Sequence, residues 1–390
     1  MKKYLMFAAA VALTTLTSLA QAQDRAVEAT VTALTGSATF KVGTGAAQPI
    51  AVGTKLPKGA EIATGDQSKL TIQAHDGIVA VAGAKTTITV DELSVSSTGM
   101  RNAQIGLKSG NLASSLDPAK KLQNNYKVST PKGVAAARGT TYSVAYDGVI
   151  YSVTVVAGVV QSFSASGIAT NVAIGQVNSD NGSGATTQTL AQAVASNPSM
   201  GDGLALLASA VASVSTNVAD VTAVIGTIAS SAGTGQTATN VVASATAAAA
   251  ATAATNTNLT NSGGGSTGVA SSIVGAAVNG SASAGNTAAA GTIVATTTVA
   301  VATTTGAPVA ALATTLSNTA NNTAGVSVNS TAVTNAANTS IQQGNTATTT
   351  TTIVETIQQT PTGTNVNIIE TPVTTPVTPV NPDISASPAG

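Results

Sequence analysis

The sequence predicts an all-β N-terminal domain, an antiparallel sandwich or roll of short strands. A low-complexity Ala/Thr/Asn-rich region follows, predicted to be partly α-helical and partly disordered. Short apolar alternations broken by Gly, Pro and Asp-Gly fill the first part and are typical of β structure. Of the 390 residues, all fifteen basic ones lie at or before Arg138, and all eight aromatic ones lie at or before Phe163. The chain therefore changes character in its middle.

Residues 1–22 have the features of a cleavable secretory signal. Lys2 and Lys3 precede a mostly apolar stretch, which ends at the small-x-small site Ala20-Gln21-Ala22. A retained anchor would need about 20 continuous apolar residues, and hydroxyl side chains interrupt this stretch. We expect export to the periplasm or the cell exterior, with no membrane span after cleavage. The chain has no Cys, so neither a disulfide nor a lipoprotein anchor can form.

Residues 23–178 are expected to form the β domain, in which Asp-Gly pairs mark two hairpins. A two-residue turn at Asp147-Gly148 would pair Tyr146 with Val149, Val144 with Tyr151, and Tyr142 with Val153. A turn at Asp76-Gly77 would likewise pair Ala74 with Val79, and Ile72 with Val81. Further strands are expected at residues 29–34, 38–42, 86–90, 104–107, 126–129 and 159–163.

Residues 179–260 are predicted to be an Ala-rich helical region. Apolar residues recur there at alternating spacings of three and four, which is typical of a coiled-coil-like stripe: Leu204, Leu207, Val211, Val214, Val218, Val221, Ile225 and Ile228. One helix over 202–230, capped by Asp202, would need a partner for this stripe. A short helix at Leu190 and Val194, the Ala-rich stretch 240–254 and a second copy are the alternatives. We expect an intramolecular hairpin, with weak self-association through 204–228 as the other outcome.

The remaining residues carry weaker signals. Residues 261–360 are a low-complexity Thr/Ala/Asn-rich region that opens on a Gly/Ser segment, 261–266, expected to be a flexible linker. A hairpin around Pro361-Thr362-Gly363 would pair 353–359 with 365–369. Residues 361–390 contain regularly spaced prolines and are predicted to be an extended tail.

Site chemistry is scarce in this composition. His75 is the only histidine, and one imidazole cannot build a multi-histidine metal site. Residues 264–268 match G-x-S-x-G but lie in a linker without a histidine partner. Asp91 and Glu92 would face opposite sides of a regular strand. No phosphate-binding loop and no dense basic run occur, which disfavours nucleic acid. We expect no catalytic, cofactor or metal site, and hence a non-enzymatic protein.

One segment carries a family resemblance. The run 128–133, Val-Ser-Thr-Pro-Lys-Gly, and the run 136–144, Ala-Ala-Arg-Gly-Thr-Thr-Tyr-Ser-Val, are similar to the signature of the FecR domain family. Upstream and downstream glycines agree with the family spacing over about 30–178. The motif positions are Asp76, Gly77, Thr130, Pro131, Gly133, Arg138, Gly139, Thr140, Tyr142 and Gly158.

The resemblance implies an exported β domain. Founding members of the family are inner-membrane regulators whose periplasmic domain receives a signal and whose cytoplasmic segment controls a sigma factor. This chain is expected to resemble the free-standing secreted members, without that segment and without the membrane helix. Two interpretations of Arg138 stay open: a clamp that holds two strands together, which we favour, and a contact for a ligand.

Two functional hypotheses follow. In the first, the FecR-like domain is a recognition or assembly module of the cell envelope on a long low-complexity region. In the second, the C-terminal region makes the protein a structural or adhesive surface or matrix protein. The partner would be an envelope protein or a polysaccharide. For the modest positive charge before Arg138 we favour ordinary surface charge offset by the acidic second half, and weak attraction to anionic envelope polymers is the other interpretation.

Overall fold

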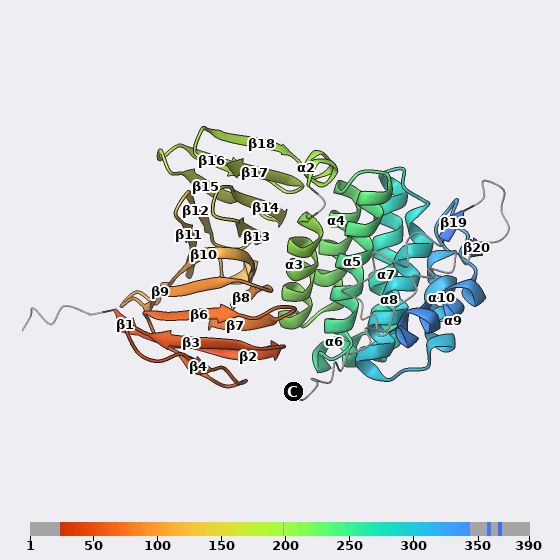
Figure 1. Ribbon diagram of the computed structural model, residues 1–390, viewed down its shortest axis with the longest axis horizontal. Helices are drawn as coiled ribbons and strands as arrows, with labels where there is room; N and C mark the ends of the chain where they lie inside the picture. The colour runs from red at the N-terminus through yellow and green to blue at the C-terminus, as the bar shows by residue number, and fades with distance from the viewer. Residues whose placement is uncertain (1–23, 198, 344–356, 360–365, 369–390) are drawn as a thin grey trace, which may run out of the picture.

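A computed structural model describes residues 24–197, 199–343, 357–359 and 366–368. Strands occupy residues 25–189 and helices occupy residues 190–342, side by side along the long axis of the molecule (Figure 1). The predicted all-β N-terminal region is therefore confirmed. The predicted signal segment, most of the predicted tail and the end of the low-complexity region lie outside the described residues. No helix in the described ranges has the length and apolar character needed to cross a membrane.

The strands form two sheets that share one long strand, β10 (Arg101–Leu116). In pairing order, sheet A contains β4 (Gln48–Pro49), β3 (Ala38–Val42), β6 (Ala60–Thr64), β9 (Thr87–Val95), the first part of β10, β11 (Asn124–Thr130), β12 (Gly133–Ala137), β15 (Val160–Ser164) and β16 (Ala169–Val172), with β1 (Arg25–Ala26) also on β9.

Sheet B contains β5 (Lys55–Leu56), β2 (Ala29–Thr35), β7 (Lys69–His75), β8 (Ile78–Ala82), the second part of β10, β13 (Thr141–Tyr146), β14 (Tyr151–Ala157), β17 (Gln176–Asp180) and β18 (Ala185–Thr189). Every pair is antiparallel except β10–β11, which is parallel. The expected purely antiparallel pattern fails there because the turn η2 (Pro118–Lys120) carries the chain from sheet B back to sheet A.

The inner faces of the two sheets enclose one apolar core of aliphatic residues and three fully buried tyrosines, Tyr126, Tyr142 and Tyr151. The Tyr126 and Tyr142 rings pack edge to face with centroids 6.4 Å apart, a favourable aromatic geometry. The hydroxyl oxygens of Tyr126 and Ser114 are hydrogen-bonded at 3.0 Å. Burial raises the pKa of all three tyrosines, so their hydroxyls stay protonated.

The expected register at Asp147-Gly148 is wrong by two residues. Tyr146 pairs with Tyr151 and Val144 pairs with Val153, so the loop has four residues. The Asp147 side chain explains the longer loop, because its Oδ1 accepts hydrogen bonds from the Val149 and Ile150 amides at 2.8 and 2.7 Å. A shift of two leaves each side chain on its predicted face.

At Asp76-Gly77 the two-residue turn forms, but the expected pairing is wrong by one. A bulge at Ala74 lets Ile72 pair with Ala80 instead of Val81. A shift of one changes the face. Val79 and Val81 therefore lie on the outer face of sheet B, where they are buried all the same.

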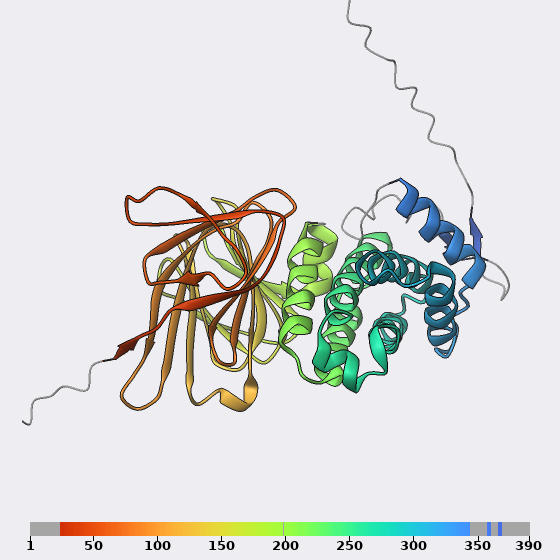
Figure 2. The same ribbon diagram turned by 90° about the horizontal axis from the view of Figure 1, so that it is seen from below.

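The helices stack outward from sheet B in successive layers (Figures 1 and 2). Their bounds are α2 (Leu190–Ser196), α3 (Met200–Val214), α4 (Val218–Ser231), α5 (Gln236–Ala253), α6 (Thr257–Ser262), α7 (Gly265–Ser283), α8 (Ala289–Thr305), α9 (Val309–Ala320) and α10 (Ser330–Gln342). Helix α3 packs on α5, α4 packs on α7, and α5 packs on α8. The linker expected at 261–266 is wrong: these residues are the end of α6, a two-residue turn at Gly263-Gly264 and the start of α7.

The single helix expected over 202–230 is two helices. Ser215 adopts an extended conformation and Asn217 caps α4, its side chain accepting from the Ala219 amide at 2.9 Å. Asn256 stabilises the break from another layer by donating to the carbonyls of Ala212 and Ser215, each at 3.0 Å. The spacing of apolar residues continues through Ser215 and predicted an unbroken helix. The Asn217 cap and the Asn256 amide, which is distant in sequence, end the helix there instead.

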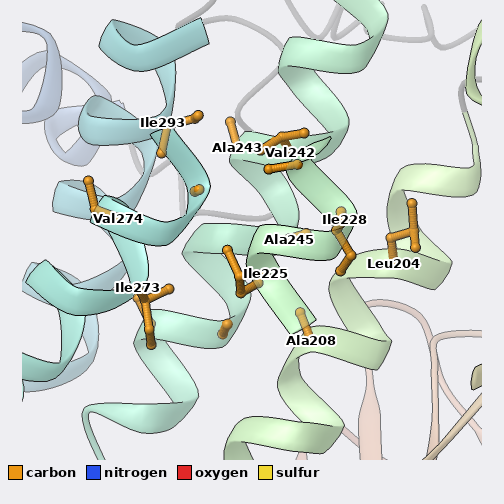
Figure 3. Close-up of a cluster of buried hydrophobic side chains, with 14 of the residues drawn as sticks. Leu204, Ala208, Ile225, Ile228, Val242, Ala243, Ala245, Ile273, Val274 and Ile293 are labelled. Carbon is orange, nitrogen blue, oxygen red and sulfur yellow. The ribbon is translucent and has the colours of Figure 1, made fainter. Parts of the chain in front are cut away.

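The apolar stripe is buried within the chain except at Val214 and Val218, which flank the break. Figure 3 shows side chains from α3, α4, α5, α7 and α8, among them Leu204, Ile225 and Ile273, pointing toward one another. The partner of α3 is the Ala-rich stretch in α5, one of the three expected alternatives. At the far end, the expected hairpin is confirmed where it is described, since β19 (Ile357–Gln359) pairs antiparallel with β20 (Val366–Ile368).

The β and α parts share a core. Helix α3 lies against β8, β10 and β13, and the outer face of sheet B contributes Val79, Val81, Ala113, Val156 and Val177 to the helical cluster. One face of sheet B therefore packs on sheet A and the other packs on helices. The run Ile-Val-Ala-Val-Ala in β8 is buried at every position, as is typical of a strand covered on both faces.

Candidate binding groove

A groove of about 930 Å³ lies on the outer face of sheet A, opposite the face of the sandwich that the helices cover. Side chains from β10, β11, β12, β15 and β16 line it, together with residues of three connections at one end of these strands. The lining residues are Gln104, Lys121, Asn125, Lys127, Val134, Ala136, Ala137, Arg138, Gly139, Thr140, Val159, Gln161, Phe163 and Asn171.

Strand register brings the polar lining residues into one row. Gln104 pairs with Lys127, Lys127 with Ala136, Ala136 with Gln161, and Gln161 with Asn171. Paired residues lie on the same face of a sheet, and five strands span about 19 Å at ~4.8 Å per strand. Ala136 stands in the middle with a single methyl group, so the row is hollow at its centre.

Three cations line the groove: Lys121, Lys127 and Arg138. All three side chains are exposed, and in the described part of the chain none forms an ion pair. No carboxylate belongs to the lining. The nearest acidic residues in the strand order, Asp91 and Glu92, lie on β9 beyond Gln104. The groove is therefore positive at the Arg138 end.

The motif residues next to Arg138 hold this end of the groove in place. A Cβ on Gly139 would lie 2.9 Å from Pro118 Cα and 3.0 Å from Lys121 Cβ, so only glycine lets the η2 turn pack here. The buried Thr140 hydroxyl donates to the Val159 carbonyl at 3.1 Å. These contacts place Lys121 beside Arg138. The strand clamp expected for the Arg138 guanidinium is not observed among the described residues.

Thr130, Pro131 and Gly133 shape the turn at the other end of β11. Thr130 Oγ1 accepts from the amides of Lys132 and Gly133 at 3.2 and 3.0 Å. A Cβ on Gly133 would lie 2.6 Å from the Phe163 carbonyl oxygen, so glycine allows β12 to approach β15. This approach sets Phe163, which pairs with Val134, at the groove.

The other motif positions lie away from the groove. Asp76 forms an ion pair with Lys120, whose Nζ lies 2.7 Å from Asp76 Oδ2, and this pairing lowers the pKa of the Asp76 carboxyl. Gly77 completes the turn with a φ of 81°. Tyr142 is in the core. Gly158 has a φ of 80° in the turn between β14 and β15 and packs against Thr140. Of the predicted positions, Arg138, Gly139 and Thr140 line the groove.

The structure also shows the surroundings of two further candidate sites, His75 and the pair Asp91 and Glu92. His75 is buried, its Nε2 lies 3.0 Å from the Asn102 carbonyl oxygen, and desolvation lowers its pKa, so the ring is neutral near pH 7. The strand at Asp91 and Glu92 is not regular, because a bulge there breaks the pairing with β10. Both side chains are half-buried, and Asp91 accepts from Thr89 and Ser129 at 2.7 and 3.2 Å. Within the described residues, no cluster of three acidic or His side chains could hold a metal.

Sequence reasoning found Arg138, Gly139 and Thr140 but missed the rest of the lining. Gln104, Lys127, Gln161 and Asn171 belong to four strands, and only the register makes them neighbours. A local signal existed in β11, where Asn125, Lys127 and Ser129 alternate with buried residues. It marks an outward polar face but does not say which strands flank it.

Comparison with known proteins places the groove in a family segment. Residues 60–161, about a quarter of the chain, match the family model described as "FecR protein", and this confirms the resemblance stated above. No curated protein matches the chain. Two solved structures of a "putative anti-sigma factor" from Parabacteroides distasonis ATCC 8503, at 2.50 and 1.65 Å resolution, align with a TM-score of 0.28 and 13% identity. The alignment covers 33% of this chain and 59% of theirs, so it spans under two thirds of those proteins.

Proposed function

We propose that this chain is a non-enzymatic, exported protein of the bacterial cell envelope, and that its FecR-like β domain is a recognition module. The groove on sheet A is the recognition site. The single observation that carries the proposal is the set of three cations, Lys121, Lys127 and Arg138, that share the groove without a carboxylate partner.

Elsewhere in the domain, five cations have carboxylate partners, among them the following four. Lys41 and Lys108 pair with Glu61, and Arg101 and Lys120 pair with Asp76. Unpaired cations gathered on one face attract anionic partners and raise their association rate. A rigid sheet also positions side chains more firmly than loops do. These features support binding.

The helical layers would then be the support of the module. Because α3 and α4 cover sheet B, the groove on sheet A is the face of the sandwich left to solvent. Export through residues 1–22 is part of the proposal, and sequencing the N-terminus of the protein recovered from cells checks it. Processed protein should begin at Gln23.

Site-specific photocrosslinking in intact cells tests the recognition site. A photoreactive amino acid replaces Gln161 in the groove, or Thr315 on the exposed side of α9 as a matched control. We expect a crosslinked species with the groove position alone. Capture through Thr315 without capture through Gln161 would contradict the proposal and favour the structural or adhesive alternative, in which the C-terminal region carries the function.

A further inference from the structure

We infer that the groove binds a strand of an acidic polysaccharide, with a sugar carboxylate held at the Arg138 end and neutral hydroxyls lying toward Gln104. This inference rests on the proposed function and names the ligand class of the same site. Charge, shape and side-chain chemistry each contribute an argument.

The charge is graded along the groove. Arg138 and Lys121 lie at one end, Lys127 lies within the row next to Gln104, and an Arg guanidinium can bind a carboxylate in a bidentate manner. Beyond Gln104, Glu92 pairs with Gln104 across the strands, and Asp91 lies at the adjacent bulge. A carboxylate that lay directly against Glu92 or Asp91 would be repelled there, whereas a hydroxyl would not. A ligand with spaced carboxylates and hydroxyls between them is accommodated along the whole row.

The shape fits a strand that crosses the face of a sheet. The row from Gln104 to Asn171 crosses five strands, about 19 Å at ~4.8 Å per strand. The backbone amides and carbonyls of β10, β11, β12 and β15 under this row pair with a strand on each side, and only β16, at the end of the row, is an edge strand. An extended peptide that binds by adding a strand needs a sheet edge, so the face of sheet A disfavours that kind of ligand.

The side chains suit hydroxyl groups. Gln104, Asn125, Gln161 and Asn171 end in amides, and each amide offers both donors and an acceptor. A sugar hydroxyl is likewise both a donor and an acceptor. Half-buried Phe163 adds an apolar ring face beside the row, against which the C–H face of a sugar ring can pack.

Binding of the full-length exported protein to polygalacturonate tests the inference, with neutral dextran and poly-L-glutamate as comparison polymers. The variants are Arg138→Gln, Lys127→Gln and Phe163→Ala. Lys58→Gln is the matched control, because Lys58 is exposed, forms no ion pair in the described part of the chain and lies outside the groove. Thermal unfolding of each variant reports folding independently of binding.

We expect Arg138→Gln to weaken polygalacturonate binding about ten-fold, the size of one charge-assisted hydrogen bond. Lys127→Gln and Phe163→Ala should also weaken it, and Lys58→Gln should leave it unchanged. Binding should fall as salt rises. Unchanged binding in Arg138→Gln and Lys127→Gln would overturn the inference. If poly-L-glutamate bound as tightly as polygalacturonate and Phe163→Ala had no effect, the inference would also be overturned, in favour of an acidic polypeptide as the ligand. The proposed function of the groove as a recognition site would still stand.

Discussion

Lys69 Nζ on strand β7 donates a hydrogen bond to Thr252 Oγ1 in the last turn of helix α5, over 3.4 Å. The contact joins sheet B to the second layer of helices. A cation at a helix C-terminus interacts favourably with the helix dipole. Nevertheless, desolvation lowers the pKa of Lys69, because the ammonium is largely withdrawn from water.

Replacing Lys69 with Met should remove a pH dependence of stability. With its pKa below 10.5 in the folded state, Lys69 binds its proton more weakly there than in the unfolded chain. As pH approaches 10.5 from below, the unfolded state therefore keeps more protons bound than the folded state does. Wild-type stability should rise with pH over that range. Urea unfolding at a series of pH values should show a smaller rise in Lys69→Met. If the free energy of unfolding rose equally with pH in wild type and Lys69→Met, the burial of this charge would be contradicted. Lys58→Met, at an exposed site, serves as the control.

Glu61 predicts a stabilising contribution that is lost in acid. Hydrogen bonds from Lys108 and then Lys41 lower the pKa of its carboxyl from 4.5 to about 2. The pairing thus stabilises the fold fully above pH 4.5, and this contribution is lost as pH falls through about 2. In Glu61→Gln, the loss of stability relative to wild type should be largest above pH 4.5 and should shrink toward pH 2. A difference that stays constant over this range would refute the assignment. The effect should be modest, because solvent screens a surface group.

The docking of helices on sheet B predicts an asymmetry between two valines. Val81 is buried under α3, whereas the Val149 side chain is 62% exposed in a loop. Val81→Asn should reduce the free energy of unfolding by about 2–4 kcal/mol, since it buries an amide and removes apolar contact. Val149→Asn should change it by less than about 0.5 kcal/mol. Chemical denaturation of both variants measures the difference, and equal effects would mean that α3 does not cover this face in solution.

A close crossing of α4 and α7 predicts opposite effects of the same substitution. A Cβ on Gly280 would lie 2.7 Å from the Gly226 carbonyl oxygen and 2.8 Å from Ala229 Cβ, whereas a Cβ on Gly226 finds its nearest atom at 3.9 Å. Alanine favours a helix over glycine by about 1 kcal/mol, and overpacking costs about 1–3 kcal/mol. We therefore expect Gly226→Ala to raise the melting temperature and Gly280→Ala to lower it. Stabilisation by both would show that the helices are farther apart than described.

Local signals predicted much of the β region. The Asp-Gly pair at 76–77 forms its expected turn, and the pairing of 357–359 with 366–368 lies within the expected hairpin. At Asp147 the turn was predicted but its length was not, because the side chain accepts two backbone amides and enlarges the loop. In the helical region, the period of the stripe correctly predicted six of its eight residues as buried, but Val214 is exposed and Val218 half-buried on either side of the break at Ser215, which the period did not predict.

The sequence by itself determined the centres of several strands in the first part of the chain and the helical character of 204–228 and 240–254, where apolar or Ala-rich patterns act over neighbouring residues, whereas the helices beyond 260 were not predicted. It also determined that the cations and aromatic rings belong to the first part of the chain. The tertiary structure alone decided that Val79 and Val81 face the helices, and that Lys127, Ala136 and Gln161 form one row. The physical reason is that a bulge or a register shift of one residue costs little locally, so packing between segments far apart in the chain selects among the alternatives.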